Sequence, residues 1–190
     1  MQTRTQNSRN KINPQKFALW AAMASITMMF GAFLSAYIVK QASGNWLEFS
    51  LPWTFYVSTI LVILISYILH LAKKSLAGDS LLRYRSLVLT GLVLGTGFVL
   101  FQYISWITLF QKGVDLKGNV SGSFLYLITG IHALHVLGGI VALIISSINT
   151  FIIPFQRLKK RINKFDLVVN YWHFVDGLWL VLFLFLLLYK

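Results

Sequence analysis

The stretch YWHFVDGLWLVLF, Tyr171 to Phe183, decides how this chain folds. It places a carboxylate, Asp176, inside a long apolar run, with His173 one helical turn before it. An ionisable side chain within a bilayer is costly, and one interhelical hydrogen bond recovers only part of that cost. The stretch therefore predicts a membrane-spanning helix whose polar groups either carry a function or bind neighbouring helices.

The rest of the chain has the composition of a membrane protein. Of its 190 residues, 57% are hydrophobic and only 12% are charged, which is about half the charged fraction of a soluble domain. The 17 Lys and Arg against five Asp and Glu give a net charge of +12, a balance also found in nucleic-acid-binding proteins. Here, however, the basic residues are confined to short segments between apolar runs, which is typical of membrane topology. Cysteine is absent, which excludes thiolate metal sites, disulfides and cysteine nucleophiles.

Five apolar runs are each long enough to cross about 30 Å of hydrocarbon at about 1.5 Å per residue. They predict an all-α bundle of five transmembrane helices in a single membrane domain, residues 1–190, behind a polar cytoplasmic tail at 1–16. The runs are continuous rather than alternating, which excludes a β-barrel. The predicted helices cover about residues 17–39, 53–71, 87–110, 122–148 and 167–189.

The distribution of Lys and Arg predicts the orientation of these helices. The N-terminal tail and the second and fourth loops hold 13 of the basic residues, and the other side of the membrane holds four. Loops rich in Lys and Arg stay on the cytoplasmic side. We therefore expect the N-terminus in the cytoplasm and the C-terminus outside.

Small residues spaced four apart recur in three of the runs. This spacing allows helix backbones to approach closely where lipid supplies no hydrophobic drive. It predicts a packed bundle and carries no information about function. The residues are Gly31 and Ser35, Gly91 and Gly95, and Gly138 and Ala142.

The fourth run, GSFLYLITGIHALHVLGGI, adds two histidines on one helical face. Counted from the run centres, His135 and Asp176 lie at nearly the same depth, so they would meet if the two helices are neighbours. An Asp176 at this depth is either protonated or surrounded by several donors or a protonated histidine. Three roles stay open: hydrogen bonds that fix helix packing, a step in a proton path, or a contact with a lipid headgroup or partner subunit. The candidate residues are His132, His135, Trp172, His173 and Asp176.

The histidines also raise the question of a metal or a haem. A di-iron carboxylate site needs several acids, and the apolar runs contain one. A bis-histidine haem needs two histidines facing one another at one depth, for which His135 and His173 are a poor pair. His70, near the end of its run, is expected to be an interfacial side chain. We therefore expect no catalytic, cofactor or metal site on this chain. Two other classes of protein compete with this interpretation: a haem-bearing membrane anchor and a small proton-coupled carrier.

Two motifs in the last two runs resemble subunit III of the haem–copper terminal oxidases, the family of cytochrome c oxidase. The first is a Gly-x-His-x-Leu-His-Val core at residues 130–136, which follows Gly122 and Phe124. The second is the Trp-His-Phe-Val-Asp signature at residues 172–176. The resemblance extends more weakly over the whole chain. It implies the five-helix form of the family, which lacks the first two helices of the seven-helix form.

Two positions depart from the family pattern. Ser25 and Ser105 stand where the family carries acidic residues, so any role of those carboxylates is not carried over. Asp176 is then the sole acid within the apolar runs, which makes proton conduction by this chain less favoured. The departures also keep open a divergent branch of the family, such as a companion of nitric oxide reductase.

The resemblance implies a subunit without redox centres that stabilises the catalytic subunit I. It would support proton uptake while the complex reduces oxygen with electrons from cytochrome c in the aerobic respiratory chain. Haem and copper would belong to partner subunits, and phospholipid would occupy clefts between helices. The expected location is the bacterial cytoplasmic (inner) membrane. A companion of a quinol oxidase stays open beside the nitric oxide reductase alternative.

Overall fold

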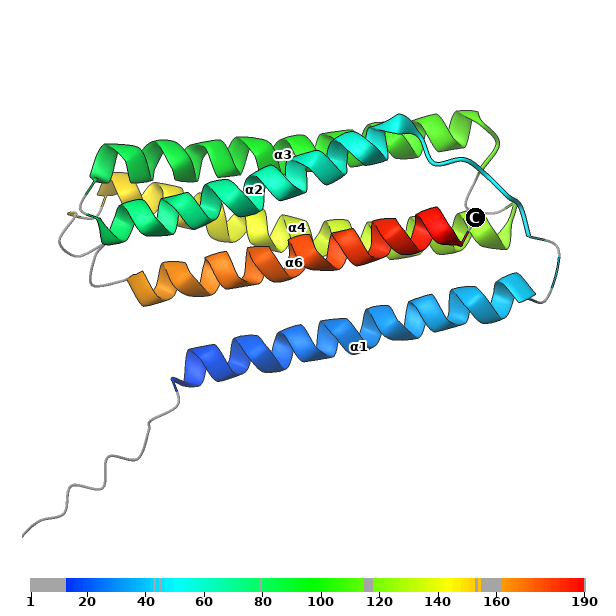
Figure 1. Ribbon diagram of the computed structural model, residues 1–190, viewed down its shortest axis with the longest axis horizontal. Helices are drawn as coiled ribbons and strands as arrows, with labels where there is room; N and C mark the ends of the chain where they lie inside the picture. The colour runs from blue at the N-terminus through cyan, green and yellow to red at the C-terminus, as the bar shows by residue number, and fades with distance from the viewer. Residues whose placement is uncertain are drawn as a thin grey trace, which may run out of the picture.

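The computed structural model describes residues 13–42, 44, 46–78, 80–114, 118–152, 154 and 162–189. This part of the chain forms five α-helices, each long and apolar enough to cross a membrane (Figure 1). The predicted all-α class with five spans is therefore confirmed. The helices are α1 (Pro14–Ala42), α2 (Trp53–Ala77), α3 (Leu81–Gln111), α4 (Val120–Ile152) and α6 (Ile162–Leu188).

The helices are longer than the apolar runs that predicted them. The prediction was wrong at the start of α3, which begins at Leu81 rather than residue 87, and at the start of α6, which begins at Ile162 rather than residue 167. Hydropathy marks only the part of a helix inside hydrocarbon, whereas backbone hydrogen bonds continue through the polar interface. The tail predicted for residues 1–16 was too long, because α1 already begins at Pro14. Proline is tolerated there because the amide it lacks would have no helical partner.

Four of the helices form a bundle and the fifth lies along one side of it (Figure 1). Helix α2 packs most extensively on α3 and also contacts α6, while α4 packs against α3 and α6. Helix α1 contacts mainly α4 and α6. Its only two buried residues are Phe30 and Tyr37, so α1 is the least embedded helix in the described chain.

Large aromatic side chains fill the centre of the bundle. Trp172 and Trp179 of α6 are the two largest fully buried side chains. The Trp179 ring stacks on Phe55 of α2, with 5.9 Å between centroids and 12° between planes. The Trp179 Nε1 also donates to Thr59 Oγ1 at 3.1 Å. Helix α6, which carries the stretch that opened the sequence, is thus the helix around which the core is built.

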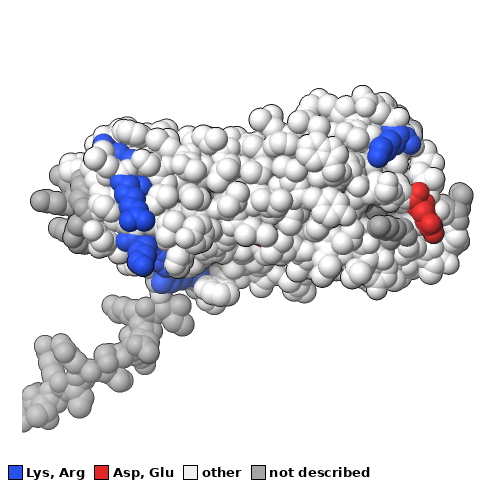
Figure 2. All heavy atoms as spheres, turned by 45° about the horizontal axis from the view of Figure 1, so that its top comes forward, with Lys and Arg blue, Asp and Glu red and all other residues white. Residues whose placement is uncertain are grey.

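The charges of the described residues divide between the two ends of the bundle. Lysine and arginine gather mainly at the end where α2 meets α3, which we call the basic end, and a smaller basic patch lies beside the acid at the opposite end (Figure 2). By their places in the chain, Glu48 and Lys112 belong to that opposite end. Asp166, near the start of α6, pairs with Lys16 of α1 at 3.6 Å and with Lys73 of α2. One carboxylate therefore ties three helices together at the basic end.

Candidate functional site

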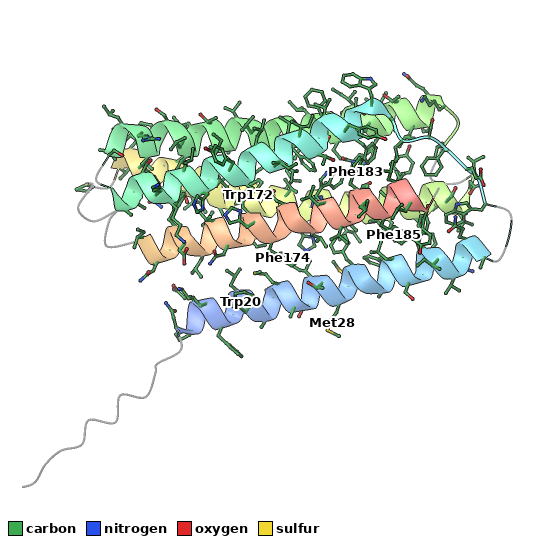
Figure 3. All side chains as sticks on the ribbon, viewed as in Figure 1. Trp20, Met28, Trp172, Phe174, Phe183 and Phe185 are labelled. Atoms are coloured by element: carbon green, nitrogen blue, oxygen red, sulfur yellow. The ribbon has the colours of Figure 1, made fainter. Side chains whose placement is uncertain are left out.

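Trp172 occupies a slot between three helices. Its indole is 1% exposed and points from α6 into the bundle (Figure 3). The Nε1 atom donates to the Gly139 carbonyl of α4 at 3.1 Å. On Gly139 an added Cβ would lie 2.9 Å from Trp172 Cε2, and on Gly95 of α3 it would lie 3.0 Å from Cη2. Both glycines approach the Nε1–Cε2–Cζ2–Cη2 edge of the indole, so the ring fits in the slot only because both lack a side chain.

The six small residues named from the sequence do not all lie between helices. Gly91 faces Leu69, whose Cδ2 would be 2.9 Å from an added Cβ, and Gly95 faces Trp172. Gly31 and Ser35 are exposed, and an added Cβ on Gly31 meets nothing within 4 Å in the described chain.

In α4, the close contact is made by a glycine that the spacing did not indicate. Gly138 is exposed, with Tyr171 Oη 3.7 Å from an added Cβ, and Ala142 is half-buried. The tight approach to α6 is at Gly139 instead. A spacing of four selects a stripe on a helix but does not show which neighbour the stripe faces.

His132 is buried where α3, α4 and α6 meet, with 1% of its surface exposed. Its Nε2 lies 3.2 Å from the Val175 carbonyl, and because a carbonyl only accepts, Nε2 carries the proton. The ring packs against Trp179 and Phe98 at centroid distances of 5.0 and 5.8 Å. Within the described chain, Nδ1 has no hydrogen-bond partner. This histidine therefore joins α4 to the backbone of α6.

Asp176 and His173 face α2, on another side of α6. Asp176 is 4% exposed, and the Ser66 hydroxyl of α2 is the side-chain hydrogen-bonding group beside it. Ser66 Oγ also hydrogen-bonds to Nδ1 of the half-buried His173. The exposed His70 lies beyond, its ring centroid 6.5 Å from that of His173. Among the described residues, Asp176 Oδ2 has no hydrogen-bond partner and no salt bridge reaches the carboxylate.

His135 faces α1 rather than Asp176. Its Nδ1 donates to the Ile131 carbonyl of its own helix at 2.8 Å, and its ring lies 5.9 Å from that of Phe30. Tyr171 of α6 donates to the His135 carbonyl at 2.9 Å. The structure therefore does not bring His135 and Asp176 together, although both belong to helices that pack against each other.

The two serines at positions where the resemblance implies acidic residues differ in their surroundings. Ser25 is exposed on α1 and donates to the Ala21 carbonyl at 3.1 Å, as serines in helices often do. Ser105 is buried, and its hydroxyl lies 2.6 Å from Thr54 Oγ1, which joins α3 to α2. Ser105 therefore makes a helix-to-helix contact, whereas Ser25 makes none within the described residues.

The described side chains do not assemble a metal-ligating group: among them, no three His, Asp or Glu residues gather at one place. What the arrangement does chemically is to pair polar atoms of α6 with α2 and α4. The fold and the site together define a multi-pass helical membrane protein whose buried polar groups connect its own helices.

Comparisons with known proteins agree with this class and narrow it. The sequence model of the family described as "Cytochrome c oxidase subunit III" matches residues 54–190. The chain is 28% identical over 187 residues to a "Probable cytochrome c oxidase subunit 3" of Nocardia farcinica, covering 95% of this chain and 91% of that protein. It is 27% identical over 168 residues to the "Cytochrome c oxidase subunit 3" of Thermostichus vulcanus, covering 85% of this chain and 80% of that protein.

This chain belongs to the cytochrome c oxidase subunit III family. Membership confirms the resemblance carried by the two motifs. It also implies that the chain is part of an oxidase complex with other oxidase subunits as partners.

Three contacts at this site were missed from the sequence. Ser66 and Thr59 sit among apolar residues of α2, and their spacing gives no signal of a partner on α6. Asp166 was missed because it lies one residue before the predicted run. Its position four residues into α6 becomes visible only once the helix is known to begin at Ile162.

Proposed function

We propose that this chain is a non-catalytic subunit III of a respiratory haem–copper oxidase. It binds beside the catalytic subunit I, stabilises it, and supports proton uptake while the complex reduces oxygen with electrons from cytochrome c. Haem and copper belong to partner subunits. The chain itself contributes a rigid helical surface.

One observation carries this proposal: the polar groups of the Tyr171–Phe183 stretch are used between helices. Trp172 donates to the Gly139 carbonyl, His132 to the Val175 carbonyl, and His173 pairs with Ser66. Interhelical hydrogen bonds of this kind contribute about 0.6 kcal/mol each and add specificity of packing. Groups engaged in this way favour a structural role over catalysis.

Substitution of Asp176 by Asn in the intact oxidase tests this role. Asparagine keeps the shape of the buried group beside Ser66 but removes any exchangeable carboxyl proton. We expect the complex to lose this subunit at a lower temperature, with oxygen consumption of fresh enzyme close to that of the wild type. The control is Glu48→Gln, which changes an exposed acid at the end of the bundle opposite the basic end. An immediate fall in proton pumping with full assembly would contradict the structural role.

Purification of the tagged chain from its native membrane tests the partners. We expect haem-bearing subunits to co-purify and the dissociated chain alone to show no Soret band. A haem spectrum that stays with the isolated chain would favour the membrane-anchor alternative. The donor that reduces the purified complex separates a cytochrome c oxidase from a quinol oxidase, and activity toward nitric oxide identifies a reductase companion.

We also propose that the basic end faces the cytoplasm, in a bacterial cytoplasmic membrane. The excess of Lys and Arg on that side supports this orientation. The natural chain contains no cysteine, so single cysteines introduced at Lys16 and Lys112 report on opposite ends. In right-side-out vesicles, an impermeant maleimide should label only the Lys112 position. Labelling of the Lys16 position alone would invert the topology.

A bound phospholipid is a further part of the proposal. A cavity of about 370 Å³ opens between α4 and α6 near the basic end. Ser146, Asn149 and Lys164 line it together with apolar residues such as Val168. A cation, a hydroxyl and an amide beside an apolar wall suit a lipid headgroup above its acyl chains. Retention of phospholipid by the detergent-purified complex, and its loss in Lys164→Glu, would test this site.

A further inference from the structure

Four polar side chains form a row between α2 and α6, which we call the polar row: His70, Ser66, His173 and Asp176. Counted at about 1.5 Å per residue from the basic end of α2, His70 lies about 10 Å and Ser66 about 16 Å along the helix. On α6, His173 lies about 16 Å and Asp176 about 21 Å from the first residue. The polar row therefore leads from the basic end to the middle of the bundle.

Hydrogen bonds join the inner members of the polar row. The Ser66 hydroxyl lies beside the Asp176 carboxyl group and hydrogen-bonds to Nδ1 of His173. A hydroxyl can accept one hydrogen bond while it donates another, so Ser66 connects the carboxyl group to the imidazole in both directions. An apolar side chain in its place would interrupt this connection.

The outer end of the polar row reaches the surface. His173 is half-buried, and its ring centroid lies 6.5 Å from that of the exposed His70. Lys73 is a further charged group near His173, and its salt bridge to Asp166 compensates part of its charge. The His173 imidazole thus lies between a buried carboxyl group and the surface, and imidazole is the side chain best suited to pass protons near neutral pH.

The inner end of the polar row stops at Asp176. This side chain is 4% exposed, and among the described residues its Oδ2 has no hydrogen-bond partner and no cation forms a salt bridge with it. Titratable groups on the other sides of α6 are engaged elsewhere: His132 of α4 donates to the Val175 carbonyl, and Lys16 of α1 pairs with Asp166. Within the described chain, the polar row therefore has one opening, at the basic end.

We propose that Asp176 exchanges its proton with the basic end through Ser66 and His173. In the outward direction, the carboxyl group donates its proton to Ser66 Oγ while Ser66 donates its own hydroxyl proton to His173 Nδ1. His173 then releases the proton on Nε2 to water at the basic end, so one proton leaves and Asp176 becomes a carboxylate. Rotation of the half-buried ring brings the transferred proton to the surface side, and the reverse sequence returns a proton to the carboxyl group.

This exchange is an activity separate from the structural role proposed above. Chains of Asp and His side chains within membrane spans are typical of proton transfer. A route with a single opening moves no net charge across the membrane, so it does not supply the protons consumed in oxygen reduction. It makes the charge at the centre of α6 follow the proton concentration on one side of the membrane.

Infrared spectroscopy of the intact oxidase after transfer into D2O tests this route. The carboxylic C=O band that is absent from Asp176→Asn is assigned to Asp176, and its shift on deuteration gives the exchange rate. Ser66→Ala should slow that rate about 10-fold to 100-fold, which corresponds to the loss of one hydrogen bond to a charged group. Ser66→Thr keeps a hydroxyl and should exchange at nearly the wild-type rate. The matched control is Ser58→Ala, which removes a buried α2 hydroxyl that donates to the Thr54 carbonyl and should leave the rate unchanged.

A second variant, His173→Gln, removes the proton-passing ring while Ser66 stays in place, and we expect a similarly slow exchange. Each fully assembled variant is also measured for backbone amide exchange in α6, which should equal that of the wild type. A wild-type carboxyl rate in either variant, a carboxyl rate that follows the amide rate, or no band lost in Asp176→Asn would overturn the route. These readouts use neither turnover nor subunit retention, so their failure is distinguishable from a failure of the proposed function.

Discussion

The Trp172 slot allows a stability effect to be worked out from the structure. In Gly139→Ala, the new methyl group would lie 2.9 Å from Trp172 Cε2, 3.0 Å from Cζ2 and 3.1 Å from Nε1. On the same edge of the indole, Cη2 lies 3.0 Å from the position that a Cβ on Gly95 would take, so the ring packs closely on α3 as well as on α4. The new methyl group must therefore shift the buried Trp172 ring or move α4 and α6 apart locally.

Two destabilising contributions and one stabilising contribution set the change in the free energy of unfolding of Gly139→Ala. Overpacking of a filled core costs about 1–3 kcal/mol. Displacing Trp172 also weakens its hydrogen bond to the Gly139 carbonyl, which contributes about 0.6 kcal/mol in a membrane protein. Alanine is favoured over glycine within a helix by about 1 kcal/mol. The net destabilisation is about 2 kcal/mol, which corresponds to a fall of about 4–8 °C in the unfolding midpoint for a chain of this size.

The adjacent glycine offers a matched control. Gly138→Ala places its methyl group 3.7 Å from Tyr171 Oη, an ordinary contact, so only the helix-propensity gain remains. We would follow tryptophan fluorescence of the purified complex during heating, together with retention of this subunit. Gly139→Ala should unfold at a lower temperature than the wild type, and Gly138→Ala at an equal or higher one. Equal unfolding midpoints for Gly139→Ala and Gly138→Ala would contradict the close packing of Trp172 against Gly139.

Two further predictions concern the basic end. Asp166→Asn removes the counter-ion of Lys16 and Lys73, and we expect a loss of about 1 kcal/mol at low salt because these pairs are partly exposed. Melting in 1 M salt should show almost no difference, since the Debye length is then about 3 Å, and a loss independent of salt would contradict an ionic role. Arg85→Lys removes the paired donation of Nε and Nη2 to the Thr150 carbonyl, at 3.0 and 2.7 Å. Amide hydrogen exchange in the last turn of α4 should then accelerate, and an unchanged exchange rate would count against this cap.

The membrane-spanning helices could be predicted from the sequence because spanning a membrane requires only a continuous apolar segment. A run of about 20 apolar residues is visible without knowing its neighbours. The helix ends were less predictable. Leu81 and Ile162 start helices within polar segments, where backbone geometry rather than hydropathy decides.

Depth in the membrane was predictable for the polar residues, but the direction that each side chain faces was not. Depth follows from counting residues along an axis, which placed His135 and Asp176 at one level. Direction depends on the rotation of each helix, and successive residues of an α-helix differ by about 100°. That rotation turns His135 toward α1, Asp176 toward Ser66, and Gly139 rather than Gly138 toward Trp172.

The contacts of α1 have a consequence for biosynthesis. Its helical partners, α4 and α6, are translated long after it. Its two ends are held by Asp166, through Lys16, and by the Tyr189 carbonyl, which accepts from Tyr37 at 2.8 Å. Helix α1 therefore cannot complete its described contacts until both α4 and α6 have been synthesised. A nascent chain halted ahead of residue 162 can pack α1 on α4 but lacks the two α6-side anchors at Asp166 and Tyr189, so both ends of α1 stay accessible to quality-control proteases until α6 is made.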